Sequence, residues 1–201
     1  MSSDFVYLAS GSPRRRELLQ QIGVSFRVVG TVVDESALTG EGALRYVLRL
    51  AAAKADAGWD RSRDAAEVPV LAADTAVVLD GQILGKPADR EDAAHMLRRL
   101  SGRTHEVLTA IAVRGAEGLR SRVSRSEVTF RLIDDAEVQA YWETGEPCDK
   151  AGAYAVQGHA AVFIAELRGS YSGVMGLPLF ETAGLLSDAG VSQWYTRGRN
   201  R

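Results

Sequence analysis

The sequence predicts an α/β protein with a large, mixed and twisted sheet, flanking helices and a cleft along the sheet. Strand-like apolar runs alternate with amphipathic helical segments along the chain, which indicates this class. In the middle of the chain, two strand-like runs are joined by a short polar turn, which favours hairpins over a strictly parallel sheet. With 201 residues and 46% hydrophobic content, the chain is long enough to bury a core without disulfides.

The N-terminal part predicts a strand, a helix and a second strand. Residues 5–9 form an apolar strand-like run. A helix is expected over residues 13–22, because it begins with proline, which is favoured in the first helical turn, and Gly23 follows at its C′ position. The second strand is predicted over residues 26–29.

A longer helix is predicted over residues 42–57, where apolar side chains recur at helical spacing. The residues expected on one face of it are Leu44, Val47, Leu48 and Ala51. The polar stretch 60–67 is expected to be a surface connection. Residues 70–79 then predict a strand whose apolar run is broken by Asp74 and Thr75.

Turn and cap signals organise the middle of the chain. Asp80-Gly81 favours a type I′ turn into a short strand at residues 83–84. Asp89 is expected to cap a helix that runs to Leu100. The residues expected on its inner face are Ala93, Met96, Leu97 and Leu100. Residues 105–113 and 119–132 predict the two long strands of a hairpin.

The C-terminal third predicts a helix capped by Asp134, a loop over residues 145–158 and a strand over residues 162–167. The capped helix is expected to run through Trp142, and Gly176-Leu177-Pro178 is expected to open the last helix. The residues of that last helix expected to face inward are Leu179, Phe180, Ala183 and Leu186. The basic tail beyond Tyr195 is expected to fray.

Charge and cysteine content exclude several classes of protein. A net charge of −2 and a pI near 6.0 argue against binding nucleic acid or a membrane surface through a general basic field. Any phosphate ligand would therefore need a local site. The single cysteine, Cys148, excludes an internal disulfide and is typical of a reducing compartment. With no signal peptide or membrane span apparent, a cytoplasmic location is expected.

The first strand leads into Ser10-Gly11-Ser12-Pro13-Arg14-Arg15-Arg16, where arginines occupy the first turn of a helix. Helix N-termini favour negative charge, so arginines there are misplaced unless an anion binds. Hydroxyl groups, free N–H groups and guanidinium groups together suit a phosphate. A solvated basic helix face is the alternative.

Two acidic residues are candidates for chemistry. Asp74 interrupts an apolar strand, and charged side chains are rarely buried unless they are paired or bind metal. Glu35 lies in a loop, where acids are usually solvated. If both converged on a phosphate, a hard cation such as Mg²⁺ or Mn²⁺ would be needed between them.

Lysine is scarce, since Lys54, Lys86 and Lys150 are the only lysines among 24 basic residues. Each is adjacent to glycine, proline or alanine, and a compact ammonium suits a point contact on a phosphate oxygen. Other chemistries lack their motifs. The histidines and Cys148 show no zinc spacing, and neither a nucleophile elbow nor a P-loop is present.

Motifs spread over most of the chain resemble those of the Maf family. In order they are Leu8-Ala9-Ser10-Gly11-Ser12-Pro13-Arg14-Arg15, Val33-Asp34-Glu35, Ala53-Lys54-Ala55, Ala73-Asp74-Thr75, Gly85-Lys86-Pro87, Leu100-Ser101-Gly102 with His105, Gly145-Glu146-Pro147, Asp149-Lys150-Ala151-Gly152-Ala153-Tyr154 and Gly176-Leu177-Pro178. The resemblance implies a single domain of Maf type over residues 1–201, similar to inosine triphosphate pyrophosphatases, with the site in a cleft between two lobes. It also implies a nucleoside triphosphate pyrophosphatase that uses a divalent cation, Mg²⁺ or Mn²⁺, and a homodimer.

Two motifs resemble the branch of the family that acts on dTTP and UTP. They are Asp74-Thr75 and Tyr154-Ala155-Val156-Gln157-Gly158. By this resemblance, Arg14, Thr75 and Gln157 would set base specificity, and a glutamine amide can both donate to and accept from a pyrimidine edge. Ala110 departs from the glycine of many relatives, which is expected to affect packing.

The expected mechanism is attack of water on the α-phosphorus, which yields the monophosphate and pyrophosphate. Glu35 and Asp74 would hold the metal, and Asp74 is also the candidate general base. Lys54 and Lys86 would neutralise charge on the phosphates. The residues expected to bind the triphosphate at the start of the first helix are Ser10, Ser12, Arg14 and Arg15.

Two alternatives stay open. A nucleotide-binding regulator of cell division would bind without turnover, although paired carboxylates favour catalysis. A different enzyme would act on 7-methyl-GTP or would remove a terminal phosphate, whereas the dTTP/UTP branch could also act on modified pyrimidine nucleotides. Thr75 and Gln157 speak against 7-methyl-GTP, and the identity of the product tests the phosphatase.

Overall fold

The computed structural model describes residues 3–62 and 68–194, and its elements follow the predicted order. The strands are β1 (Val6–Leu8), β2 (Phe26–Val28), β3 (Val70–Leu79), β4 (Gln82–Leu84), β5 (Thr104–Gly115), β6 (Gly118–Phe130) and β7 (Ile164–Arg168). The α-helices are α1 (Pro13–Gln21), α2 (Ala43–Arg61), α3 (Arg90–Leu100), α4 (Asp135–Glu143), α5 (Tyr171–Met175) and α6 (Leu179–Asp188). Short 3-10 helices lie at η1 (Glu146–Asp149), η2 (Ala151–Ala153) and η3 (His159–Phe163).

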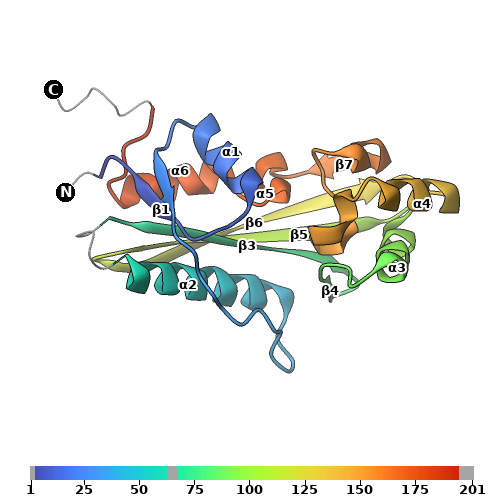
Figure 1. The fold of residues 1–201 in the computed structure, drawn as a ribbon, viewed down its shortest axis with the longest axis horizontal. Coiled ribbons are helices and arrows are strands. Elements are labelled where there is room, and N and C mark those ends of the chain that lie inside the picture. Colours follow the sequence, from blue (N-terminus) through green and yellow to red (C-terminus); the bar gives the residue numbers. More distant parts are fainter. Residues whose placement is uncertain (1–2, 63–67, 195–201) are drawn as a thin grey trace.

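The strands form one seven-stranded sheet in the order β2-β1-β3-β5-β6-β7, with β4 paired to β3 outside that path. β1 pairs in parallel with β2 and β3, whereas the pairs β3–β4, β3–β5, β5–β6 and β6–β7 are antiparallel. The predicted mixed sheet is therefore confirmed. Its long strands β3, β5 and β6 run along the length of the molecule (Figure 1).

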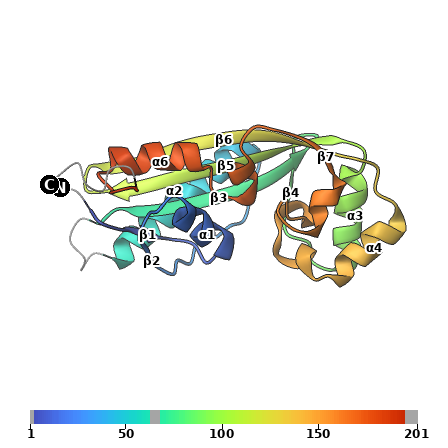
Figure 2. The ribbon, with the colours of Figure 1, turned by 90° about the horizontal axis from the view of Figure 1, so that it is seen from above.

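Helices cover the sheet in two places, which gives the molecule two lobes (Figure 2). In the first lobe, α1 and α6 lie on one face of the sheet and α2 on the other (Figure 1). The core beneath α1 and α6 contains Leu19 and Leu186, and the core beneath α2 contains Ala51. In the second lobe, α3 and α4 pack on a separate core that includes Phe130 and Tyr141.

Strand β3 connects the two lobes and has an incompletely paired edge. Along one edge it pairs with β5 over residues 70–78. Along the other edge, β1 pairs only with Val70 and Leu71, and β4 pairs with residues 77–79. Within the described ranges this second edge pairs with no strand between Leu71 and Val77, and Asp74 lies in that gap.

Helix α2 packs unusually close to the sheet because of a glycine. A Cβ on Gly58 would lie 2.7 Å from Cγ1 of Val70 and 3.1 Å from Cβ of Ala9. Such contacts are too short for any larger residue without a shift of the helix. The glycine therefore lets α2 lie against the sheet, and the preceding turn of the helix carries Lys54.

The local signals for turns and caps are confirmed. Asp80 and Gly81 have φ values of 52° and 75°, as a type I′ turn requires. Asp89 and Asp134 accept backbone N–H bonds as the caps of α3 and α4. Gly23, with a φ of 64°, follows the end of α1.

Several predicted details were wrong. Helix α2 continues to Arg61, so the start of the expected surface connection is helical, and residues 63–67 of that stretch lie outside the described residues. Leu44 is 42% exposed, and the inner face of α2 instead includes Leu50. Phe180, expected to face inward, is 89% exposed.

The C-terminal elements also differ in their bounds. The strand expected from residue 162 begins at Ile164, because η3 occupies the preceding residues. The strand expected to reach residue 132 ends at Phe130, and the expected loop 145–158 contains η1 and η2. Helix α5 was not predicted, and the tail from Tyr195 lies outside the described residues. No helix in the described ranges is long and apolar enough to cross a membrane.

Candidate active site

A cavity of about 640 Å³ lies between the two lobes, beside the gap in the pairing of β3. It is lined from the first lobe by the turn between β1 and α1 and by α2, and from the second lobe by the segments after β4 and η2. Every site residue predicted from the sequence lines it, namely Ser10, Ser12, Arg14, Arg15, Glu35, Lys54, Asp74, Thr75, Lys86 and Gln157.

The turn between β1 and α1 forms one wall of the cavity. Ser12, the N-cap of α1, makes no side-chain capping bond, and the first turn of α1 contains no acidic residue. The backbone N–H of Ser12 instead donates to Oγ of Ser10, at 3.3 Å. The positive end of this helix is thus uncompensated by its own chain, which suits an anion.

Arg15 is held at three points on the cavity wall. Its guanidinium donates to the backbone oxygen of Gly176 at 2.8 Å, to Oγ of Ser10 at 3.1 Å and to Oγ1 of Thr75 at 3.4 Å. Burial lowers the pKa of Arg15, while the negative charge of Asp74 opposes that change. An arginine remains charged under these conditions, so it presents a fixed positive charge to the cavity.

Lys54 lies between the two candidate acids. Its ammonium is 2.6 Å from Oε1 of Glu35 and 2.7 Å from Oδ1 of Asp74. Burial raises the pKa of Asp74, which is only 6% exposed, despite the nearby charges of Lys54 and Arg15. Burial also acts on the pKa of Glu35, but the hydrogen bond and charge of Lys54 outweigh it and lower that pKa. Neighbouring carboxylates with diverging pKa values are typical of acid–base chemistry.

The loop that carries Glu35 is tied to helix α2. The hydroxyl of Tyr46 donates to the backbone oxygen of Glu35 at 3.0 Å, and Arg49 donates to the backbone oxygen of Ser36, also at 3.0 Å. Arg49 is paired in turn with Glu41, whose pKa the hydrogen bond lowers to about 2. These bonds hold the Glu35 carboxylate over the cavity.

The carboxylates of Glu35 and Asp74 fit a hard divalent cation. Both contact the same ammonium, so they converge on one point. Magnesium is commonly bound by one or two carboxylates together with substrate phosphates and water. The described residues include no group of three or more His, Cys, Asp or Glu suited to a metal ion. A cation here would therefore need oxygens from a phosphate ligand to complete its coordination.

Thr75 points away from Asp74, since successive side chains on a strand face opposite sides. Its Oγ1 is 3.0 Å from Oγ1 of Thr109, which also contacts the backbone oxygen of Gly173 at 2.8 Å. Ala110 is fully buried opposite Asp74 in the register between β3 and β5. Because Ala110 is buried, its methyl group in place of the glycine of many relatives is expected to affect packing next to Asp74.

Lys86 and Gln157 come from the second lobe. Lys86 is exposed after β4, where the N–H of Gly152 donates to the backbone oxygen of Gly85 at 3.0 Å. Gln157 is an exposed residue of the segment between η2 and η3. Both side chains therefore reach the cavity from the side opposite α1 and α2.

Several liners were not among the predicted site residues, and Lys150, Tyr46 and Thr31 are three of them. Lys150 was singled out for its rarity but not assigned, and it lies next to Asp149, with which it forms an ion pair. Tyr46 and Thr31 carried no motif. Tyr46 precedes Lys54 by two turns of α2, so helical spacing was a signal that could have found it.

His105 is deeply buried in the second lobe. It is 3% exposed, and its Nε2 lies 2.8 Å from the hydroxyl of Tyr154 in the core of the second lobe. Burial lowers the pKa of His105 to about 4. It therefore belongs to the neutral core rather than to the charged cavity.

Comparison with known proteins gives a consistent result. A sequence model of the Maf family, described as Maf-like protein, matches residues 5–189. The dTTP/UTP pyrophosphatase of Aromatoleum aromaticum is 56% identical over 196 residues, which cover 92% of this chain and 95% of that protein. The dTTP/UTP pyrophosphatase of Chromobacterium violaceum is 51% identical over 187 residues, covering 92% and 94%.

Among solved structures, a nucleoside-triphosphatase (dITP/XTP pyrophosphatase) of Mycobacterium abscessus is similar over 91% of this chain and 93% of that chain. Its sequence identity is 15% and the TM-score is 0.48. This likeness is weak, and the fold described above rests on the chain's own elements.

Proposed function

This chain belongs to the Maf family, and on that premise we propose that it hydrolyses dTTP and UTP to the monophosphate and pyrophosphate. The observation that carries the proposal is the shared contact of Lys54 with Glu35 and Asp74 inside a cavity walled by arginine and serine. A triphosphate needs cationic partners, and its hydrolysis needs an activated water. The cationic residues that can bind a triphosphate and the carboxylates that can activate a water line the same cavity.

The triphosphate is bound at the start of α1. Ser10 and Ser12 offer hydroxyl and N–H donors, and Arg14 and Arg15 offer charge, in a helix turn that no acidic residue compensates. Arg15 is already oriented by Ser10 and Gly176, so little side-chain entropy is lost on binding. Lys86 approaches the phosphates from the second lobe.

Asp74 is the general base. Its raised pKa, caused by burial, brings its basicity closer to that of a group that can accept a proton from water near neutral pH. Lys54 keeps the carboxylate oriented and neutralises charge on the α-phosphoryl group. The attacking water breaks the bond between the α- and β-phosphates, so pyrophosphate leaves.

A divalent cation, Mg²⁺ or Mn²⁺, would be held by Glu35 and Asp74. When bound, it supplies Lewis-acid stabilisation of phosphoryl charge. The convergence of both carboxylates on Lys54 supports this assignment. Lys54, which contacts both carboxylates in this structure, would then interact with the phosphates.

Base selection falls to Arg14, Thr75 and Gln157. All three line the cavity, and Gln157 comes from the segment between η2 and η3. A glutamine amide matches the adjacent acceptor and donor of thymine or uracil, and it also tolerates pyrimidines modified away from that edge. Modified pyrimidine nucleotides therefore belong to the proposed substrates.

Three further properties complete the proposal. Residues 1–201 act as a single domain, which the continuous sheet through both lobes supports. The protein is cytoplasmic, in keeping with a lone free cysteine, Cys148. It forms a homodimer, which light scattering during size-exclusion chromatography tests directly.

The deciding experiment measures products from purified protein with Mg²⁺ or Mn²⁺ and dTTP, UTP, CTP, GTP or 7-methyl-GTP. Pyrophosphate released chiefly from dTTP and UTP is the expected result. Preference for 7-methyl-GTP would keep the chemistry and overturn the base assignment. Orthophosphate as the first product would indicate a terminal phosphatase, and binding without turnover would indicate a nucleotide-gated regulator.

A further inference from the structure

We propose that Glu146 is a positioning residue for base selection, because its carboxylate fixes the backbone segment 155–160 that carries Gln157. The inference rests on the proposed function, since it assigns Gln157 a place in reading the nucleobase. Glu146 itself lies outside the residues that line the cavity. It acts through the segment that does line it.

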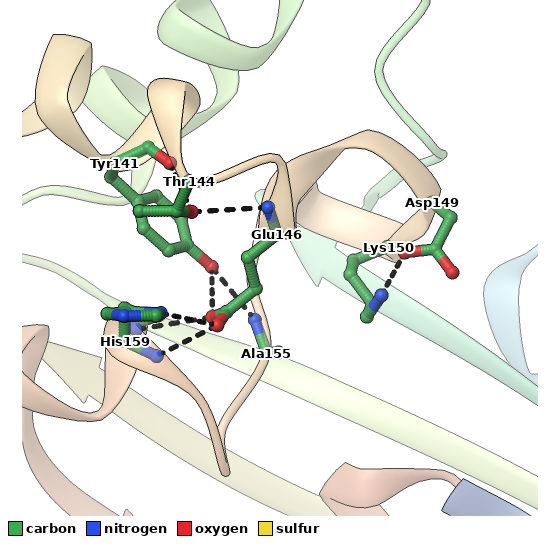
Figure 3. A network of polar contacts seen from close by, with 8 residues as sticks. Tyr141, Thr144, Glu146, Asp149, Lys150, Ala155 and His159 are labelled. Atoms are coloured by element: carbon green, nitrogen blue, oxygen red, sulfur yellow. Dashed lines mark hydrogen bonds and ion pairs between the residues drawn. The ribbon is translucent and has the colours of Figure 1, made fainter. Parts of the chain in front are cut away.

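The carboxylate of Glu146 collects several donors at once (Figure 3). Oε1 accepts from the hydroxyl of Tyr141 at 2.7 Å and from the N–H of Ala160 at 3.3 Å. Oε2 accepts from the N–H of His159 at 2.9 Å and lies 3.1 Å from Nδ1 of the same histidine. Three of these contacts come from the segment that follows Gln157.

The other side of Gln157 is fixed through the same network. The hydroxyl of Tyr141, which donates to Glu146, also accepts from the N–H of Ala155 at 3.2 Å (Figure 3). Ala155 precedes Gln157 by two residues, and His159 follows it by two. The backbone is therefore held by hydrogen bonds two residues before and two residues after Gln157. One reaches the Glu146 carboxylate directly and the other reaches it through the hydroxyl of Tyr141.

Gly158 gives independent evidence that the sequence leaves space for the contact between Glu146 and the segment 155–160. A Cβ on Gly158 would overlap all three terminal atoms of the Glu146 carboxyl group. Its φ of −107° is open to any residue, so the glycine is needed for space and not for conformation. The chain thus leaves room for the carboxylate directly beside Gln157.

The chemistry of the contacts requires a carboxylate. Hydrogen bonds from Tyr141 and His159 outweigh the effect of burial and lower the pKa of Glu146. An ionised carboxylate only accepts hydrogen bonds, and the hydroxyl and both backbone N–H groups around it are donors. A glutamine of the same shape would turn an amide donor toward some of these donors and leave them unpaired.

The test compares Glu146→Gln with Glu143→Gln, a matched change at an exposed residue of α4. For Glu146→Gln, KM for dTTP and UTP should rise about tenfold, which corresponds to about 1.4 kcal/mol, with kcat changed less than about twofold. The preference in kcat/KM for dTTP over CTP should fall by a similar factor. Glu143→Gln should match the wild type in each measurement.

Amide hydrogen exchange of segment 155–160, followed by mass spectrometry, tests the positioning step without any turnover. Exchange should accelerate in Glu146→Gln and remain unchanged in Glu143→Gln. Unchanged exchange in Glu146→Gln would overturn the inference. Faster exchange with an unchanged preference for dTTP would overturn the link to base selection. If the wild type hydrolyses neither dTTP nor UTP, the proposed function fails, and the exchange result still decides the role of Glu146.

A double-mutant cycle with Gly158→Ala separates this contact from a general loss of stability. Gly158→Ala alone should raise KM for dTTP much as Glu146→Gln does, because the added methyl displaces the carboxylate. In a Glu146→Ala background, the same change should have less than about a twofold further effect. Fully additive effects would contradict the inference.

Discussion

The ammonium of Lys54 lies 2.7 Å from the carboxylate of Asp74, a residue in the stretch of β3 that, among the described residues, has one unpaired edge. The same ammonium contacts Glu35 at 2.6 Å. One cation therefore balances two acids, and its charge does not fully offset burial at Asp74. This arrangement leaves a single basic carboxylate facing a set of anion-binding groups.

Asp74→Asn should lower kcat by roughly 100- to 10,000-fold, because the amide cannot accept a proton from water. Burial raises the pKa of Asp74, so above that pKa the charged carboxylate costs folding free energy. The melting temperature of Asp74→Asn at neutral pH should therefore equal or exceed that of the wild type. Steady-state kinetics measure kcat and calorimetry measures the melting temperature, with Asp188→Asn as an exposed control. Turnover near that of the wild type in Asp74→Asn would refute the role of Asp74.

Glu35→Gln should weaken metal binding. A neutral amide is a poorer ligand for a hard cation than a carboxylate, so the Mg²⁺ concentration for half-maximal activity should rise roughly 10- to 100-fold. Asp34→Asn is the control, since it keeps the oxygen that accepts from the N–H of Ser36. Equal Mg²⁺ titrations for Glu35→Gln and the wild type would remove Glu35 from the metal site.

Arg15→Lys should raise KM for dTTP about tenfold or more. A lysine keeps the charge but cannot contact Ser10, Thr75 and Gly176 together, because it lacks the planar fork. Arg16→Lys, at an exposed position of the same helix, should leave KM unchanged. If the two variants behaved alike, the fixed geometry of Arg15 would have no part in binding.

His105 should make the folded state sensitive to acid. Burial lowers its pKa from 6.5 to about 4, so between these values the folded state binds fewer protons than the unfolded state. The free energy of unfolding should therefore fall as the pH drops from 7 to 4.5, with His105 contributing about 2–3 kcal/mol of that fall. Urea titrations of His105→Gln should show a shallower dependence, whereas the exposed His95→Gln should follow the wild type.

Elements with strong local chemistry could be predicted from the sequence. The turn at Asp80-Gly81 and the caps Asp89 and Asp134 depend on residues close together in the chain, and all three are confirmed. Phe180 was assigned to the wrong face because it is apolar. It lies six residues before Leu186, about 240° around a helix, so only one of the two can face the sheet.

The sequence predicts candidate residues that line one cavity, but it could not predict how they pair. Motifs identified Lys54, Glu35 and Asp74, yet one ammonium between two carboxylates depends on how closely α2 approaches the sheet. That approach follows from the contact of Gly58 with Val70, which lies between a helix and a strand and so cannot be seen in the local pattern of either element. The network around Glu146 likewise joins α4 to the segment after η2 through tertiary contacts.

The gap in the pairing of β3 also affects the tendency of the protein to aggregate. An apolar strand with a free edge is a template for pairing with another chain, and proteins normally cover such edges. Here the β1–α1 turn and the β4 hairpin stand at either end of the gap. A shortened protein without β4 would present a longer bare edge of β3, and we expect it to self-associate into aggregates. The hairpin that precedes Lys86 therefore also limits strand pairing between copies of this protein.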